Sequence, residues 1–188
     1  MKRKNSEYTH FIEGKHIYLR EVRLSDVNDE YYNWLNDHEI SRFLETRFFP
    51  QSITSITKYV ESLVDSRESV FLAVIEKKTN KHIGNAKIGP INWIHRAANF
   101  ALILGDKSIW GKGYGTQAIK LLVDYAAYTL NLNRLNETAY SNHARTIKMC
   151  LNAGFKIEGV MKKSRFFRGE YVDEVVLGLN LQEVRGCK

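Results

Sequence analysis

Cysteine and proline are scarce in this chain of 188 residues, which contains two of each. Cys150 and Cys187 are too few for a disulfide framework and lack the Cys-x-x-Cys spacing of a metal knuckle. Pro50 and Pro90 are too few for a collagen-like or proline-rich architecture. These shortages exclude a disulfide-stapled scaffold and a fibrous protein, and they predict no metal centre.

Long hydrophobic runs and internal repeats are also absent. The longest apolar run is far shorter than the roughly 20 residues of a membrane-spanning helix, and the basic N-terminus lacks the apolar core of a signal peptide. We therefore expect a cytoplasmic protein with no membrane partner. Because the polar breaks are too short for a linker, the sequence predicts a flexible basic N-terminus at 1–12, one domain at 13–184 and a tail at 185–188.

The composition is that of a globular domain with a basic surface. Hydrophobic residues make up 44% of the chain and charged residues 26%, which excludes a wholly disordered chain. The 28 basic and 21 acidic residues give a net charge of +7. A positive surface suits a polyanionic ligand. A phosphate-rich cofactor and a nucleic acid both fit this balance.

The hydrophobic pattern alternates between strand-like and helix-like segments. It predicts a strand at 16–23, a helix capped by Ser25 or Asp26, and a helical stripe from Ile53 to Val64. This order favours a mixed α/β (α+β) fold, with a meander in the middle and β-α-β character late in the chain. Further strands are predicted at 70–77, 83–89, 99–104, 135–140, 155–161 and 171–181, and further helices at 116–130 and 144–151.

A glycine cluster stands between a predicted strand and the clearest helical pattern. Residues 110–116 read Trp-Gly-Lys-Gly-Tyr-Gly-Thr. Three glycines in five residues permit positive φ and remove side chains that would block a close approach to the backbone. The free amides of the loop and of the first helical turn then converge at a place where the helix dipole favours an anion. The cluster therefore predicts a phosphate site.

Three phosphate-binding loops compete for this segment with a plain strand–helix turn. A P-loop does not fit, because Gly105 and Gly111 are one residue too far apart and Gly113 follows Lys112 where Ser or Thr belongs. A dinucleotide fingerprint does not fit either, because the glycines read GxGxG and no acidic residue follows about 20 positions later. The third loop is the pyrophosphate loop of coenzyme A acyltransferases.

Four stretches, in order along the chain, carry a resemblance to one family. They are Ile83-Gly84-Asn85-Ala86, Ile103-Leu104-Gly105-Asp106, the glycine cluster continued to Ala118, and Asn152-Ala153-Gly154-Phe155. Together they resemble the GNAT N-acetyltransferase superfamily, in particular its ribosomal-protein-alanine (RimJ/RimL) branch. The resemblance covers roughly residues 14–181. It implies a twisted mixed sheet with a splayed centre, flanked by helices, and acetyl-CoA as co-substrate.

The resemblance also implies which residues hold the coenzyme. The backbone of Leu102, Ile103 and Leu104 would pair with the pantetheine arm, and Arg145 would contact a phosphate. Either Asn142 or His143 stands where the branch has a pantetheine-binding asparagine. The pyrophosphate would be held by the loop, namely Gly111, Lys112, Gly113, Tyr114, Gly115 and Thr116.

The catalytic positions depart from the family pattern. Cys150 stands where many members have a tyrosine that protonates the departing thiolate, and a cysteine there is more often a small buried hydrophobe. Thr146 takes the place of a serine found in the branch, so its hydroxyl is our candidate proton donor, although it could also simply bond a helix carbonyl. His143 is a candidate proton relay.

The general base is not specified by the resemblance, because Asn99 stands where an acidic residue is often found. Glu13, Glu45 and Glu137 are the alternatives, and a water relay is another. Glu137 is the only carboxylate of the predicted 135–140 strand. We expect direct transfer of the acetyl group to a primary amine without a covalent enzyme intermediate.

The acceptor is expected to lie near the first helices. Trp34, Glu45 and Arg47 belong to a segment that resembles amino-sugar acetyltransferases, so a small amine such as an amino sugar is our main hypothesis. A protein N-terminal amine is the alternative. A non-catalytic coenzyme- or nucleic-acid-binding module, suggested by the basic segment 162–168, is a third. We expect no further macromolecular partner except a second copy in a homodimer.

Overall fold

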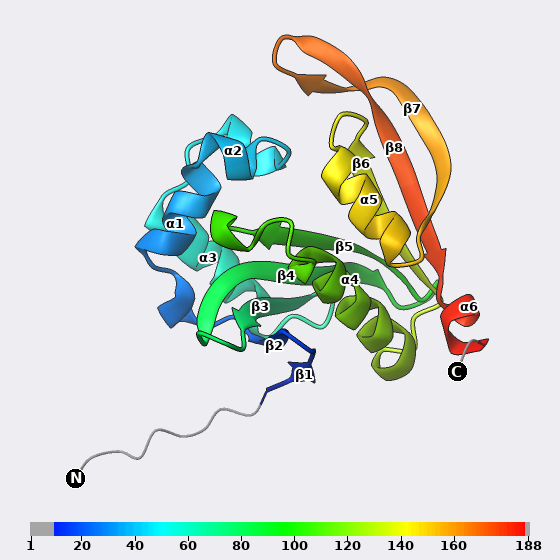
Figure 1. Ribbon diagram of the computed structural model, residues 1–188, viewed down its shortest axis with the longest axis horizontal. Helices are drawn as coiled ribbons and strands as arrows, with labels where there is room; N and C mark the ends of the chain where they lie inside the picture. The colour runs from blue at the N-terminus through cyan, green and yellow to red at the C-terminus, as the bar shows by residue number, and fades with distance from the viewer. Residues whose placement is uncertain (1–9, 187–188) are drawn as a thin grey trace.

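The structure, a computed structural model, describes residues 10–186 and is built around one eight-stranded sheet (Figure 1). Neighbouring strands are antiparallel, except for β5 and β6, which are parallel. The expected mixed fold with a twisted sheet is confirmed. In spatial order the strands are β1 (Ile12–Glu13), β2 (Ile17–Glu21), β3 (Val70–Glu76), β4 (Lys81–Asn92), β5 (Ala97–Leu104), β6 (Arg134–Tyr140), β8 (Glu170–Asn180) and β7 (Lys156–Phe167).

Helices cover both faces of the N-terminal part of the sheet. Ile17 and Leu19 of β2 pack on one face with Ile119 and Leu122 of α4, whereas Tyr18 points to the other face, where α1 and α3 lie. The helices are α1 (Asp29–Asn36), α2 (His38–Ser41), α3 (Ile53–Val64), α4 (Tyr114–Asp124) with a π-helical extension η4 (Tyr125–Thr129), α5 (Ala144–Asn152) and α6 (Leu181–Gly186), and the short 3-10 turns are η1 (Leu24–Asp26), η2 (Glu45–Phe48) and η3 (Lys107–Ile109).

The helix predicted to start at Ser25 or Asp26 begins later. Those residues lie in η1, and Asn28 caps α1 by accepting a hydrogen bond from the Tyr31 amide. Asp26 is not a cap for α1, because both of its carboxylate oxygens bond the Arg20 guanidinium at 2.7 Å. An ion pair with a strand residue six positions earlier therefore engages the side chain that the sequence pattern assigned to the helix cap.

The sheet divides between β5 and β6, the one parallel pair among the described strands. β5 and β6 pair over Ala97–Asn99 and Arg134–Asn136, and beyond these residues no register joins them. β5 stays paired with β4 up to Leu104, while β6 stays paired with β8 up to Tyr140. In Figure 1, α5 and the β6-β8-β7 arm lie on one side of this split and β4, β5 and the N-terminal helices on the other. This is the splayed centre that the resemblance implied.

The basic segment 162–168 is strand rather than loop as far as Phe167, and Arg168 lies in the turn. We expected a loop between strands at 155–161 and 171–181, but β7 continues to Phe167. The reason is pairing across the hairpin, since Lys162 bonds Asp173 at 2.8 Å and the Arg165 guanidinium is ion-paired with Glu174. The basic side chains that suggested an exposed loop are therefore partly neutralised by carboxylates of β8.

The ordered contacts extend beyond the expected domain boundaries of 13 and 184. Residues 1–9 and 187–188, which belong to the predicted termini, lie outside the described residues. The Phe11 amide already bonds the β2 backbone. At the other end, the Arg185 guanidinium donates to the Leu132 carbonyl at 2.7 Å, so α6 is fastened to the end of the α4–η4 segment.

Gly105 provides a stability test of this packing. A Cβ at Gly105 would lie 1.9 Å from the Trp34 ring, which is 6% exposed. Gly105→Ala should therefore destabilise the protein by about 1–3 kcal/mol, because an overfilled core must shift. Gly159→Ala is the matched control, since no atom lies within 4 Å of its Cβ position. Equal denaturation midpoints for the two variants would contradict this packing.

Candidate active site

The glycine loop ends in an uncapped helix N-terminus. Gly111 (φ +80°) and Gly113 (φ +84°) adopt the left-handed conformation that favours glycine, and α4 begins at Tyr114. No side chain caps the helix, so its first-turn amides have no intrahelical acceptor and carry the positive end of the dipole. No atom lies within 4 Å of a Cβ built at Gly111 or Gly113. The loop therefore leaves room for an anion beside unpaired donors.

A cavity of about 370 Å³ opens in front of this loop. Trp110 forms part of its wall, and the indole donates a hydrogen bond to the Leu104 carbonyl at 2.9 Å. The Arg145 guanidinium lies 4.6 Å from the Trp110 ring centroid and also lines the cavity. A cation beside an uncapped helix N-terminus suits a pyrophosphate.

Most of the predicted coenzyme residues meet at this cavity, and two do not. The lining includes Leu102 to Leu104, Arg145, His143 and the loop residues other than Lys112. Lys112 is exposed and its amide is already bonded to the Ile109 carbonyl. Asn142 is exposed in the turn before α5 and lines neither this cavity nor the next. Of the two candidates for the pantetheine contact, His143 is therefore the one beside the cavity.

The edge of β5 supplies backbone groups for an extended ligand. Ile103 directs its carbonyl towards Gly84 of β4. Because successive backbone groups of a strand alternate in direction, Leu102 and Leu104 direct theirs into the split, where the Leu104 carbonyl already accepts the Trp110 indole hydrogen bond. β6 has already diverged there, so it does not pair with them. An extended chain such as pantetheine can add to this edge as a strand would.

A second cavity, of about 570 Å³, lies on the other side of the split. It is lined by α1, α3, β3, β4, β5, β6 and the β7–β8 hairpin, with aromatic side chains that include Tyr31, Tyr59 and Phe100. The two cavities share Leu102, Ile103, His143, Thr146 and Met149 among their lining residues. A molecule in one cavity can thus meet a molecule in the other where β5 and β6 separate.

Thr146 and His143 lie at this junction. The Thr146 hydroxyl is 3.1 Å from His143 Nε2, and the His143 ring is stacked on Phe43 with 3.9 Å between centroids. Burial, together with the charges of Arg42 and Arg145, lowers the pKa of His143 to about 4. His143 is therefore a neutral imidazole at pH 7. The third catalytic candidate, Glu137, lines the second cavity only.

Three carboxylates line the second cavity, and two of them are ion-paired. Arg165 bonds Glu45 at 3.2 Å and is also paired with Glu174, which is 3% exposed. Glu45 also accepts a hydrogen bond from the Tyr140 hydroxyl at 3.0 Å. Glu137 has no such cation, and burial, with a smaller contribution from Glu174, raises its pKa to about 8. Among the described residues, Glu137 is the carboxylate of this cavity best matched to proton transfer at neutral pH.

Several other candidates are held in structural contacts. Trp34 belongs to the core beneath α1 and lines neither cavity at the split. The Arg47 guanidinium donates to the Leu44 and Phe166 carbonyls and to the Tyr140 hydroxyl at 2.9–3.1 Å, and it does not line the second cavity. It therefore joins η2 to the β7–β8 hairpin. Glu13 lies at β1, paired with Lys77.

Cys150 is fully buried in the core. Burial, with a smaller contribution from Glu137, raises the pKa of its thiol to about 12. A thiol this basic and this inaccessible is a poor proton donor and a poor nucleophile. The expectation of a small buried hydrophobe at this position fits its surroundings.

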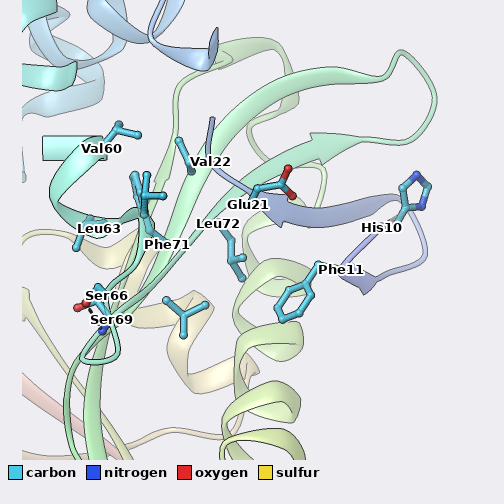
Figure 2. Close-up of a pocket in the computed structure, with 12 residues that line it drawn as sticks. His10, Phe11, Glu21, Val22, Val60, Leu63, Ser66, Ser69, Phe71 and Leu72 are labelled. Atoms are coloured by element: carbon cyan, nitrogen blue, oxygen red, sulfur yellow. Dashed lines mark hydrogen bonds between the residues drawn. The ribbon is translucent and has the colours of Figure 1, made fainter. Parts of the chain in front are cut away.

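A third hollow lies away from the split, between the C-terminal half of α3 and the edge near β2 and β3 (Figure 2). Its lining is mostly apolar, and its two titratable side chains, His10 and Glu21, are not bonded to each other, because His10 pairs with Glu13. No group of three or more metal-ligating side chains occurs within residues 10–186. No helix in this range is long and apolar enough to cross a membrane.

Comparison with known proteins agrees with this geometry. The acetyltransferase (GNAT) domain family matches residues 16–156, which is more than half of the chain. The chain therefore belongs to the GNAT acetyltransferase family, whose members transfer the acetyl group of acetyl-CoA to an amine. It is an N-acetyltransferase with acetyl-CoA as co-substrate, and the non-catalytic alternative is wrong.

Proteins of similar sequence include several N-acetyltransferases. An uncharacterised N-acetyltransferase p20 of Bacillus licheniformis is 24% identical over 170 residues, which covers 89% of this chain and 94% of the relative. The spermidine N(1)-acetyltransferase of Escherichia coli K12 is 33% identical over 88 residues, or 47% of each chain. The structure of spermidine N-acetyltransferase from Vibrio cholerae with CoA and spermine has a TM-score of 0.81 at 21% identity, covering 89% of this chain and 96% of that one. These relatives support the family without singling out its RimJ/RimL branch.

Sequence reasoning missed the groups that the second cavity takes from distant strands. Tyr140, Arg165 and Glu174 come from β6, β7 and β8, and Asn85 and Lys87 come from β4. The alternation of β8 could have singled out Glu174, because a carboxylate among inward-facing apolar residues is unusual. No local signal joins that carboxylate to Glu45, which is more than a hundred residues away.

The loop assignment can be tested with two glycines that share a backbone conformation. Gly113→Val should weaken acetyl-CoA binding by about tenfold or more, because the side chain would occupy the anion space and disturb charge-assisted hydrogen bonds. Gly169→Val is the control, since Gly169 (φ +90°) is equally strained and equally open but lies at the β7–β8 turn. Calorimetric titration should show a changed Kd only for the Gly113 variant. Equal acetyl-CoA affinities would remove the loop from the site.

Proposed function

We propose that the acceptor is a small-molecule primary amine that enters the second cavity. The observation that carries the proposal is the cavity, lined in part by aromatic rings, that meets the coenzyme side at Thr146 and holds Glu137 without a paired cation among the described residues. The names of the spermidine acetyltransferase relatives support a small amine. An amino sugar belongs to the same class of acceptor. The RimJ/RimL-type alternative, a protein N-terminus, would require a peptide to enter this cavity.

Acetyl-CoA, when bound, supplies an activated acetyl thioester. Glu137 would take a proton from the acceptor ammonium, directly or through a water, and so free the nitrogen lone pair for attack on the thioester carbonyl. A carboxyl with a pKa of about 8 is a better-matched base than an ordinary glutamate. A backbone N–H at the free β5 edge, near Leu102, would stabilise the negative charge that develops on the carbonyl oxygen.

The sulfur leaves as a thiol once it has gained a proton. The Thr146 hydroxyl is our proposed donor, and His143 is placed to replenish it across the 3.1 Å contact. A neutral imidazole can release a proton from one ring nitrogen while it takes one at the other, so its lowered pKa does not prevent a relay. Two substrates held at one junction gain most of their acceleration from proximity. The cytoplasmic location and the homodimer remain predictions.

The proposal is tested by thiol release from acetyl-CoA over amino sugars, polyamines, simple alkylamines and N-terminal peptides. Turnover should occur with small amines, and kcat/KM should rise through about pH 8 as Glu137 loses its proton. Glu137→Gln should lower kcat by about 10²-fold and abolish that ionisation, because an amide cannot accept the proton. Turnover of peptides alone would identify a protein acceptor. An unchanged pH profile in Glu137→Gln would exclude Glu137 as the base.

Substitutions at Thr146 and Cys150 test which of these two side chains donates the proton to the departing thiolate. Thr146→Ala should lower kcat by about 10²-fold with little change in acetyl-CoA affinity, and Thr146→Ser should retain activity because the hydroxyl remains. Cys150→Ala should cost stability through the cavity that it leaves, with nearly normal kcat. Steady-state kinetics and thermal unfolding of the three variants decide the matter. A large kcat loss in the cysteine variant with normal kinetics in Thr146→Ala would reverse the assignment.

A further inference from the structure

The two ends of the acceptor cavity differ in chemistry, because the carboxylates lie at one end and a lysine at the other. Its carboxylates, including Glu137, come from β6, β8 and η2 at one end. At the other end β4 contributes Lys87 and Asn85, and α3 contributes Tyr59. A symmetrical cationic ligand would meet two unlike environments in such a cavity. The difference between the two ends therefore indicates which chemical group the acceptor has at the end remote from its amine.

Lys87 is the charge at the β4 end. Its ammonium donates to the Tyr59 hydroxyl at 3.1 Å and lies 5.5 Å from the centroid of that ring. No ion pair joins it to a carboxylate in the part of the chain that the structure describes. Lys87 is half-buried, while Tyr59 is 42% exposed, so this end opens towards solvent beside α3. A half-buried ammonium without a carboxylate is available to a ligand's oxygen atoms.

Asn85 lies two residues before Lys87 and lines the same cavity. It is 3% exposed, and its Oδ1 is 2.9 Å from His82 Nε2. Its Nδ2 lies near the Tyr31 hydroxyl without reaching hydrogen-bond geometry, and it has no partner among the described atoms. A buried amide without a partner is costly, and a ligand oxygen would remove that cost.

At the opposite end, one carboxylate is left for the amine. Arg165 is ion-paired with both Glu45 and Glu174, so among the described residues Glu137 is the one carboxylate of this cavity without a paired cation. Lys87 is opposite Ala101 in the β4–β5 register, and Glu137 follows the last β5–β6 pair. Two strand spacings, or about 10 Å between backbones, are the smallest separation of these positions, because β6 diverges from β5 beyond the last pair. The cavity thus has a carboxylate end and an ammonium end at the scale of a small molecule.

We propose, on the basis of the function proposed above, that the acceptor carries an oxygen-rich group at the end remote from its amine, held by Lys87 and Asn85. Hydroxyl and carboxylate oxygens share the required chemistry, because both accept hydrogen bonds from an ammonium and an amide. A second ammonium at that end would be repelled by the Lys87 ammonium and would find hydrogen-bond donors, on Lys87 and Asn85, where it needs acceptors. The cavity therefore selects against polyamines and for amino sugars, amino alcohols or amino acids.

A series of amines of equal length tests this directly. Aminopentanoate, aminopentanol, pentylamine and diaminopentane differ only in the remote group. Binding to the CoA-saturated protein by calorimetry, and kcat/KM by thiol release, should favour the oxygenated compounds over diaminopentane by about tenfold or more, since like charges in a partly desolvated site repel. Glucosamine and spermidine extend the comparison to natural amines. The order of aminopentanoate and aminopentanol distinguishes an anionic group from a hydroxyl.

A charge reversal provides the second arm. Lys87→Glu should invert the series, so that diaminopentane binds best, while the acetyl-CoA KM stays at its wild-type value. Lys120→Met is the control for a lost lysine, because Lys120 is exposed on α4 and lines neither cavity at the split. The amine series measured on the wild-type protein tests the proposal by itself, so a poorly folded Lys87→Glu protein does not prevent the test.

The failures of the two proposals are distinguishable. Wild-type preference for diaminopentane, or the absence of binding by every oxygenated amine, overturns the remote-group inference. An unchanged order in folded Lys87→Glu also overturns it, because another group would then set the preference. Thiol release with any small amine still supports the proposed function in each of these cases.

Discussion

The parallel pairing of β5 with β6 is the constraint on which the site depends, because it joins the two halves of the sheet over only three residue pairs. Up to Asn99 the pairing holds the halves together, and beyond it each strand follows its other neighbour. Longer pairing would satisfy the backbone groups of Leu102 internally and would close the junction between the two cavities. The early end of one hydrogen-bonded ladder thus creates both the coenzyme edge and the acceptor entrance.

A chain of buried polar groups connects the outer part of the sheet to the cavity. Arg20 forms two hydrogen bonds with Asp26, His82 lies 4.0 Å from the same carboxylate, and His82 in turn contacts Asn85. Burial alone would raise the pKa of Asp26, but Arg20 and the Arg23 amide lower it. Burial lowers the pKa of His82, because it disfavours the charged imidazolium. The packing of η1 on β2 therefore positions an amide on the cavity wall.

On the other side of the split, the β7–β8 hairpin is held against the N-terminal half by side chains. Arg165 reaches Glu45, and Arg47 reaches the Phe166 carbonyl, so η2 and the hairpin are linked in both directions. The aromatic rings of Phe43 and Phe167 stack between them. These contacts close the far side of the acceptor cavity. Arg47, which looked like a substrate contact in the sequence, is part of this closure.

The sequence alone determined the features that depend on near neighbours along the chain. The alternation of β3 to β5 and the helical stripe of α4 are local patterns that predict these strands and this helix. The glycines 111–115 before α4 predict the anion site. Only the tertiary structure decided the acceptor side. Lys87, Glu137 and Arg165 are separated by 28 residues or more, and the strand order β4-β5-β6-β8-β7 brings them to one cavity. The packing of η1 on β2 also reassigned Asp26 from a helix cap to an ion pair with Arg20, because a buried guanidinium requires a carboxylate more than α1 requires that cap.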